Sequence, residues 1–214
     1  MAIYLYFFYE VVLGLNGAII FSAMSLFTIY NAINDPLLSY LMDRNTRFTK
    51  KWGRRFPWMI LGFFPWCVSF YFIFATPAID ITTNPWPLFW YLIVMLSLQD
   101  TFLVFYGLNI GVVRPDIFRT EKERRNLVPW WIGMDIASTI VAMIIGPYLI
   151  GMGNTKSGFV FMAGVFTILA LIFCIISLPG NWEDKIVKER YFSIDENKER
   201  MNFITSVKNG LKTR

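Results

Sequence analysis

The segment from Asn31 to Trp58, NAINDPLLSYLMDRNTRFTKKWGRRFPW, passes from a long apolar run into a dense basic loop. Asn31, Asn34 and Asp35 lie near the end of the apolar run, and residues 43–57 then carry six Lys or Arg. Loops rich in Lys and Arg beside membrane spans face the cytoplasm. The segment therefore predicts the cytoplasmic end of a membrane helix that holds a carboxylate within the membrane.

The composition of the whole chain also favours a membrane protein. Of its 214 residues, 56% are hydrophobic and only 16% are charged, whereas soluble domains carry more charge. The net charge of +5 lies in loops between apolar runs, which argues against a nucleic-acid partner. The chain has no His, and it shows neither a nucleophile–base pair nor a set of metal ligands. We therefore expect that the protein is not an enzyme and that it has neither a metal centre nor an organic cofactor.

Five apolar runs are long enough to cross a bilayer as helices, which takes about 20 residues. They are residues 17–41, 57–75, 88–113, 129–150 and 158–179. A sixth apolar run, residues 2–15, reaches only about 20 Å against a hydrocarbon core of about 30 Å. It is either a re-entrant or tilted partial helix, or the outer half of a spanning helix whose beginning is missing from this chain. We favour the second interpretation.

The basic residues orient these spans. Residues 43–57, 114–127 and the tail from Gly180 together hold 19 of the 20 Lys and Arg, and only Lys156 lies in the opposite loops. All three basic segments fall on one side if each of the six runs crosses the membrane. We expect a multi-pass protein of the plasma membrane with a cytoplasmic C-terminus.

The polar tail, residues 180–214, has apolar residues at helical spacing. Met201, Ile204, Val207 and Leu211 could form one face of an amphipathic helix on the membrane surface. A linker helix that packs on the cytoplasmic face of the bundle fits equally well. The domain prediction is therefore a membrane bundle over 1–179 and a cytoplasmic segment over 180–214.

Four ionisable residues lie within the spans, namely Glu10, Asp35, Asp100 and Asp135. The spans contain no Lys or Arg, so these carboxylates either hold a proton or bind a cation. Asn31 and Asp35 share one helix face with Asn34 beside them, and such oxygen ligands suit Na⁺ or H⁺. We predict a cation site there, although hydrogen bonds to neighbouring helices would also explain these polar groups.

Asp100 lies in the middle of the apolar run 88–113, together with Gln99, Tyr106 and Asn109. These four residues could line a polar substrate cavity or form hydrogen bonds between helices. Asp135 lies near the cytoplasmic end of its span, where pairing with a loop arginine is favoured over contact with substrate. Glu10 is expected near the outer interface, where a carboxylate costs less.

Two groups of motifs resemble a known transporter family. The first is Asn31-Ala-Ile-Asn-Asp-Pro36, Asp43-Arg44, Trp52-Gly53-Arg54-Arg55 and Pro57-Trp58, and the second is Pro115, Glu123-Arg124 and Leu127-Val128-Pro129. Together they resemble the glycoside–pentoside–hexuronide:cation symporters, the melibiose-permease-like branch of the major facilitator superfamily. The resemblance implies a fold of twelve helices in two six-helix bundles, of which this chain is similar to the N-terminal bundle with its first helix truncated.

The resemblance also implies roles for particular residues. Asp35 matches the second of two helix-two carboxylates that bind the coupling cation, and Asn31 replaces the first. Gly107 and Ile132 stand where melibiose-permease-like members carry an acidic and an arginine sugar ligand, so Asp100 could substitute. The cytoplasmic loops resemble the superfamily's gate between the bundles; their residues are Asp43, Arg44, Gly53, Arg54, Arg55, Glu123 and Arg124, with Asp135 nearby.

These observations together predict an all-α membrane protein that is half of a cation-coupled secondary transporter. The expected solute is a sugar or a related small polar molecule, the coupling ion is H⁺ or Na⁺, and the partner is the missing C-terminal bundle or a second copy. An uncoupled facilitator, a carrier of lipid-like solutes, and a non-transporting half-transporter that acts as a membrane scaffold remain alternatives.

Overall fold

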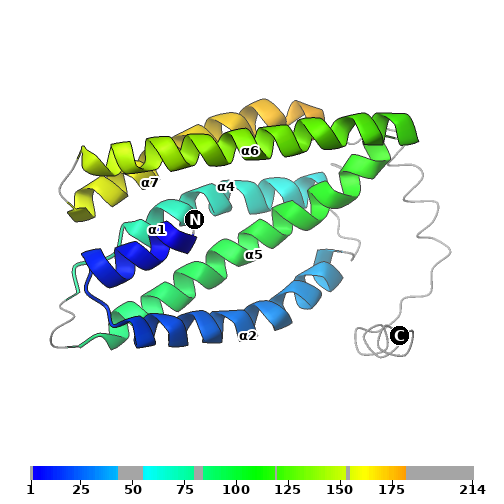
Figure 1. The fold of residues 1–214 in the computed structure, drawn as a ribbon. Helices are drawn as coiled ribbons and strands as arrows, with labels where there is room; N and C mark the ends of the chain where they lie inside the picture. Colours follow the sequence, from blue (N-terminus) through cyan, green and yellow to red (C-terminus); the bar gives the residue numbers. More distant parts are fainter. Residues whose placement is uncertain (1, 43–54, 80–83, 119, 153–154, 182–214) are drawn as a thin grey trace.

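The computed structural model describes residues 2–42, 55–79, 84–118, 120–152 and 155–181, and within them every regular element is helical. The elements are α1 (Ala2–Phe7), the π-helix η1 (Phe8–Val12), α2 (Gly17–Met42), α4 (Phe56–Phe74), α5 (Trp86–Ile117), α6 (Glu121–Gly151), α7 (Thr155–Ser177) and the 3-10 turn η2 (Pro179–Asn181). Figure 1 shows the long helices side by side in one bundle. The all-α prediction is confirmed.

Five of the described helices are long and apolar enough to cross a membrane, namely α2, α4, α5, α6 and α7. They coincide with the five apolar runs of the sequence, and α2 and α4 differ from the predicted bounds by only one residue at an end. Helices α5 and α6 are longer than their apolar runs. The apolar run marks only the part of a helix that lipid would surround, whereas the helix itself continues until a cap ends it.

A capping box explains why α6 begins eight residues before the predicted span. The Thr120 hydroxyl accepts a hydrogen bond from the backbone N–H of Glu123, and the Glu123 carboxylate accepts one from the backbone N–H of Thr120. Two backbone donors that the helix leaves unpaired are thereby satisfied. Residues 114–117 therefore belong to α5 and residues 121–127 to α6, so most of this basic segment is helical.

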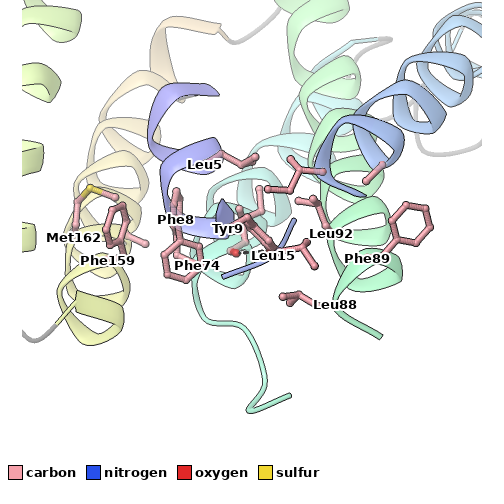
Figure 2. Packing of buried hydrophobic residues seen from close by; sticks show 14 of the residues in the cluster. Leu5, Phe8, Tyr9, Leu15, Phe74, Leu88, Phe89, Leu92, Phe159 and Met162 are labelled. Atoms are coloured by element: carbon pink, nitrogen blue, oxygen red, sulfur yellow. Dashed lines mark hydrogen bonds between the residues drawn. The ribbon is translucent and has the colours of Figure 1, made fainter. Parts of the chain in front are cut away.

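The short first helix lies at the centre of the core. Leu5 of α1 and Phe8 and Tyr9 of the adjoining η1 are buried and pack with residues of α4, α5 and α7 (Figure 2). The Phe8 ring contacts the rings of Phe74 and Phe159, and the Tyr9 hydroxyl donates to the carbonyl of Ile73 at 3.0 Å. A segment that is too short to span therefore packs against the end of α4 and the beginnings of α5 and α7.

The longer helices contact one another in the order α2, α5, α4, α7, α6. Helix α2 thus lies at one edge of the bundle and α6 at the other, as Figure 1 shows. Both edge helices expose large apolar side chains, such as Ile33 on α2 and Ile144 on α6. Exposed apolar faces of this extent are expected where lipid or a second bundle covers them.

Candidate functional site

The main polar cluster lies in the seam between α2 and α5. With the Asn31 amide oriented by its hydrogen-bond partners, its nitrogen donates to Asp35 Oδ1 at 2.8 Å and to Asp100 Oδ2 at 3.0 Å. One neutral NH₂ group therefore bridges two carboxylates that come from different helices. The structure brings together two of the three predicted cation residues of α2, Asn31 and Asp35, and one residue of the predicted cavity on α5, Asp100.

Helical spacing and a proline explain the α2 half of this cluster. Asn31 and Asp35 are four residues apart, so their side chains lie above one another on one face of the helix. Pro36 lies inside α2 and lacks the N–H that would otherwise bond the carbonyl of Ala32. An acceptor without its helical partner near a carboxylate adds to the negative potential of the seam.

A second set of hydrogen bonds between α2 and α5 involves the neighbours of Asn31, Asp35 and Asp100 in the sequence. The Thr101 hydroxyl lies 2.8 Å from the Tyr30 hydroxyl, accepts from Asn34 Nδ2 at 3.3 Å, and donates to the carbonyl of Ser97 at 2.7 Å. Asn34 is buried, and Asp35 is exposed. Asn34 thus holds α2 against α5, which leaves Asn31 and Asp35 to face Asp100.

The negative charge of the seam has no cationic counterpart in α2 or in the part of α5 before Arg114. Residues 17–42 and 86–113 contain no Lys or Arg. Two carboxylates that approach one nitrogen repel each other, and removal from water raises the cost of keeping both charged. A proton or a small cation would relieve that repulsion. In the described part of the chain, no group of three or more acidic or cysteine side chains forms a site for a bound metal.

The other residues of the expected substrate cavity lie in packed surroundings. Asn109 is 0% exposed, Gln99 is 7% exposed, and the Tyr106 ring packs against the rings of Phe63 and Trp66. These three side chains lie on the parts of α5 that pack against other helices. Of the four residues expected around a cavity, Asp100 is the one that the structure places beside Asp35.

Asn109 instead links three helices at the end of the bundle that leads into the basic loop. Its amide oxygen accepts from the Arg55 guanidinium at 3.3 Å, and its amide nitrogen donates to Phe105 O at 2.6 Å and to Met42 S at 2.9 Å. Met42 ends α2 and Arg55 precedes α4. The arginine expected in the gate is therefore held by a residue expected in the cavity, a contact that the sequence did not indicate.

We predict that Asn109→Leu lowers the free energy of unfolding by about 1–3 kcal/mol, the usual cost of leaving a buried polar partner unsatisfied. The change removes the acceptor that Asn109 offers to Arg55 but keeps the side-chain volume similar. Thermal unfolding in detergent measures the effect. Thr139→Val is the matched control, because Thr139 is exposed and its hydroxyl donates only locally, to Asp135 O. Equal unfolding midpoints for Asn109→Leu and the control would contradict the prediction.

The remaining predicted residues are distributed as follows. Glu123 forms the capping box of α6, and the Arg124 side chain donates to the carbonyl of Phe118 at 2.8 Å, so both stabilise the turn between α5 and α6. Asp135 is exposed on α6. Asp43, Arg44, Gly53 and Arg54 lie outside the described residues, as do their proposed gate contacts and the amphipathic helix expected in the tail.

Sequence reasoning missed Tyr30, Ser97 and Thr101 as members of the polar seam. Tyr30 and Asn34 are four residues apart, and Thr101 directly follows Asp100. That spacing is a signal that these side chains share the faces already singled out. Tyr and Thr in a membrane helix are weaker indicators of a functional site than a carboxylate, because inserting their hydroxyl groups into the membrane costs much less free energy.

The chain is similar in sequence to known membrane transporters. Residues 1–214 match the sequence model of a family described as MFS/sugar transport protein. An uncharacterized symporter of Synechocystis sp. is 30% identical over 147 residues, which are 68% of this chain and 26% of that protein. The sodium-dependent lysophosphatidylcholine symporter 1-A of Danio rerio is 25% identical over 126 residues, which are 59% of this chain and 22% of that protein.

A putative 2,3-dihydroxypropane-1-sulfonate exporter of Escherichia coli is 27% identical over 195 residues, which are 88% of this chain and 39% of that protein. No solved structure matches the chain. The chain therefore spans between about a fifth and two fifths of the length of these relatives.

Proposed function

Because the chain belongs to the MFS/sugar transport protein family, whose members are membrane transporters and not enzymes, we propose that it acts in cation-coupled transport of a sugar or a related small polar solute. The observation that carries this proposal is the Asn31 amide, which bridges Asp35 and Asp100 across the α2–α5 seam. Two membrane carboxylates from separate helices, held at one point, form a place where an ion can control helix packing.

The coupling mechanism follows from the charge of this pair. Without an ion, Asp35 and Asp100 repel each other across the seam, and the hydrogen bonds of Asn31 offset only part of that repulsion. Binding of H⁺ or Na⁺ neutralises one charge and lets α2 and α5 approach. An ion that stabilises one seam geometry more than the other shifts the population toward it, which is the requirement for alternating access.

A second bundle is part of this proposal. The seam carries Asp35 on an exposed surface, and the relatives are much longer than this chain. A C-terminal bundle, or a second copy of this one, would cover that surface and enclose the solute between the two halves. In this arrangement the basic segments face the cytoplasm of a plasma-membrane protein, and Arg55 with the adjoining loop forms the cytoplasmic gate.

Transport of a lipid-like solute is the second candidate function. It is favoured by the similarity to the Danio rerio protein, whose name specifies sodium dependence and a lysophospholipid. The polar seam would serve either solute, because it concerns the coupling ion. The two candidates differ in whether uptake responds to sugars or to amphiphilic lipids.

The proposed function is tested by reconstituting the protein with its second bundle in liposomes and imposing a Na⁺ or a proton gradient. Labelled sugars and a labelled lysophospholipid are offered in parallel. Gradient-dependent accumulation of a sugar supports the proposal, and accumulation of the lysophospholipid alone supports the second candidate. Equal uptake with and without either gradient would rule out coupling and favour a facilitator.

Asn31 offers a test of ion preference. Asn31→Asp adds a third carboxylate to the seam, and we expect the apparent affinity for Na⁺ to rise at least about tenfold, since a charge about 4 Å away interacts with several kcal/mol at intermediate dielectric. The measurement is the Na⁺-dependent rise of the thermal unfolding midpoint at constant ionic strength. Asn31→Leu, similar in size but without a ligand atom, is the control. A Na⁺ response that is the same in both variants would exclude a cation at this position.

A further inference from the structure

A groove lies between α7 and α4, away from the polar seam. It has a volume of about 900 Å³ and is lined by Tyr71 of α4 and by Lys156, Ser157, Val160, Phe161, Gly164, Val165 and Ile168 of α7. Helix α4 separates it from α5, which carries Asp100. The volume lies in the range of small-molecule sites, so the groove is large enough for a ligand that the transport site does not account for.

The groove has the dimensions of one lipid leaflet. Its lining residues follow a stripe of α7 from Lys156 to Ile168, a rise of about 18 Å at 1.5 Å per residue. Half the hydrocarbon core of a bilayer is about 15 Å. Phe161 and Ile168 are 51% and 60% exposed, so this stripe opens outward from the bundle. A groove of this length would reach from a membrane surface to near the bilayer centre.

The polar end of the groove carries a positive charge. Lys156 is the only Lys or Arg in residues 76–87 and 151–157. Its ammonium group donates to the carbonyl of Thr76 at 3.1 Å, which fixes it at the groove mouth and uses one of its three donors. It lies in the first turn of α7, where the helix dipole also favours an anion.

We propose that this groove binds a membrane phospholipid, with the phosphate on Lys156 and one acyl chain along Val160, Gly164 and Ile168. An amphiphile of leaflet length fits both the cation at the surface and the apolar stripe below it. A small polar solute would leave the apolar stripe unused, and a free phosphate would contact only the mouth. The lipid would tie α7 to α4 and the loop at Thr76 and so stabilise this end of the bundle.

The test is native mass spectrometry of the full chain after purification with added phosphatidylglycerol. We expect wild type to retain one phosphatidylglycerol, and Lys156→Gln to bind it about fivefold more weakly, the size expected for one Lys beside an anionic headgroup. Lys156→Arg should restore binding. Val160→Trp keeps the cation but fills the groove, and it should also lose the lipid. Excess inorganic phosphate should not displace the lipid from wild type.

Lys122→Gln is the matched control, since Lys122 is an exposed basic residue at the opposite end of the bundle. Thermal unfolding of each variant establishes that the compared proteins are folded. Equal phosphatidylglycerol affinity in wild type and Lys156→Gln would overturn the proposal. So would an equal loss in Lys122→Gln, which indicates charge alone, or displacement by inorganic phosphate, which indicates an anion site without a lipid chain.

Discussion

Replacing Asp35 by Asn is expected to abolish solute accumulation against a gradient while leaving exchange of solute across the membrane. The amide has nearly the same shape as the carboxylate and can still pair with Asn31, so the seam should stay closed. It can neither take up a proton nor balance the charge of a cation. The protein would then equilibrate the solute without drawing on the ion gradient, as a facilitator does.

The prediction is measured as the accumulation ratio of labelled solute in liposomes with an imposed gradient, together with counterflow without one. Asp100→Asn should give the same separation of accumulation from exchange, because Asn31 bonds both carboxylates. Asp135→Asn is the matched control, since Asp135 is also a carboxylate within a span but is exposed on α6, which is separated from α2 by three helices. Unchanged accumulation in Asp35→Asn would exclude the coupling role.

Local patterns in the sequence were sufficient to predict the long helices and the shared helix face of Asn31 and Asp35. Apolar length gives the spans, and the i, i+4 spacing of Asn31 and Asp35 gives a shared face. The contact between Asp35 and Asp100 through Asn31 could not be predicted from local patterns. It depends on which helices pack together and how each is rotated, and a carboxylate 65 positions away in the chain carries no local sign of either.

Asn109 shows why polar residues in spans are hard to assign from sequence. An amide in an apolar run indicates that a polar partner exists, but not whether that partner is a solute, an ion or another helix. The structure supplies Met42, the last residue of α2, and Arg55, which directly precedes α4, as partners. A side chain expected to face solute is thereby part of the connection between α2, α4 and α5.

The first residue of α6 could have been predicted from the sequence. Thr120 is followed three residues later by Glu123, the pattern of a capping box. The interpretation of 114–127 rested instead on its charge, which reports the membrane boundary and not the helix boundary. The burial of the short first helix could not be predicted from a local sequence pattern, because it depends on packing against residues of α4, α5 and α7.

Gly62→Leu is expected to prevent the bundle from folding, because α5 packs directly against Gly62 of α4. A Cβ at this position would lie 2.6 Å from Phe105 Cβ, 2.7 Å from Phe102 O and 2.7 Å from Tyr106 N. Two of these three atoms belong to the backbone, so no side-chain rotation can make room. Overpacking in a core costs about 1–3 kcal/mol where side chains can adjust, and more where backbone must move. Folded yield in detergent, measured by size-exclusion chromatography, should fall sharply.

A pair of Gly→Ala variants separates this clash from the effect of side-chain chemistry. Gly107 also lies inside a helix, on α5, but a Cβ there would meet nothing within 4 Å. Alanine is favoured over glycine in a helix by about 1 kcal/mol, so Gly107→Ala should raise the unfolding midpoint, whereas Gly62→Ala should lower it. Because α5 carries Asp100, separation of α5 from α4 in Gly62→Ala should also weaken the Na⁺-dependent stabilisation. Unfolding midpoints that rise alike in both variants would show that α4 and α5 do not require glycine to reach the spacing that positions the ion site.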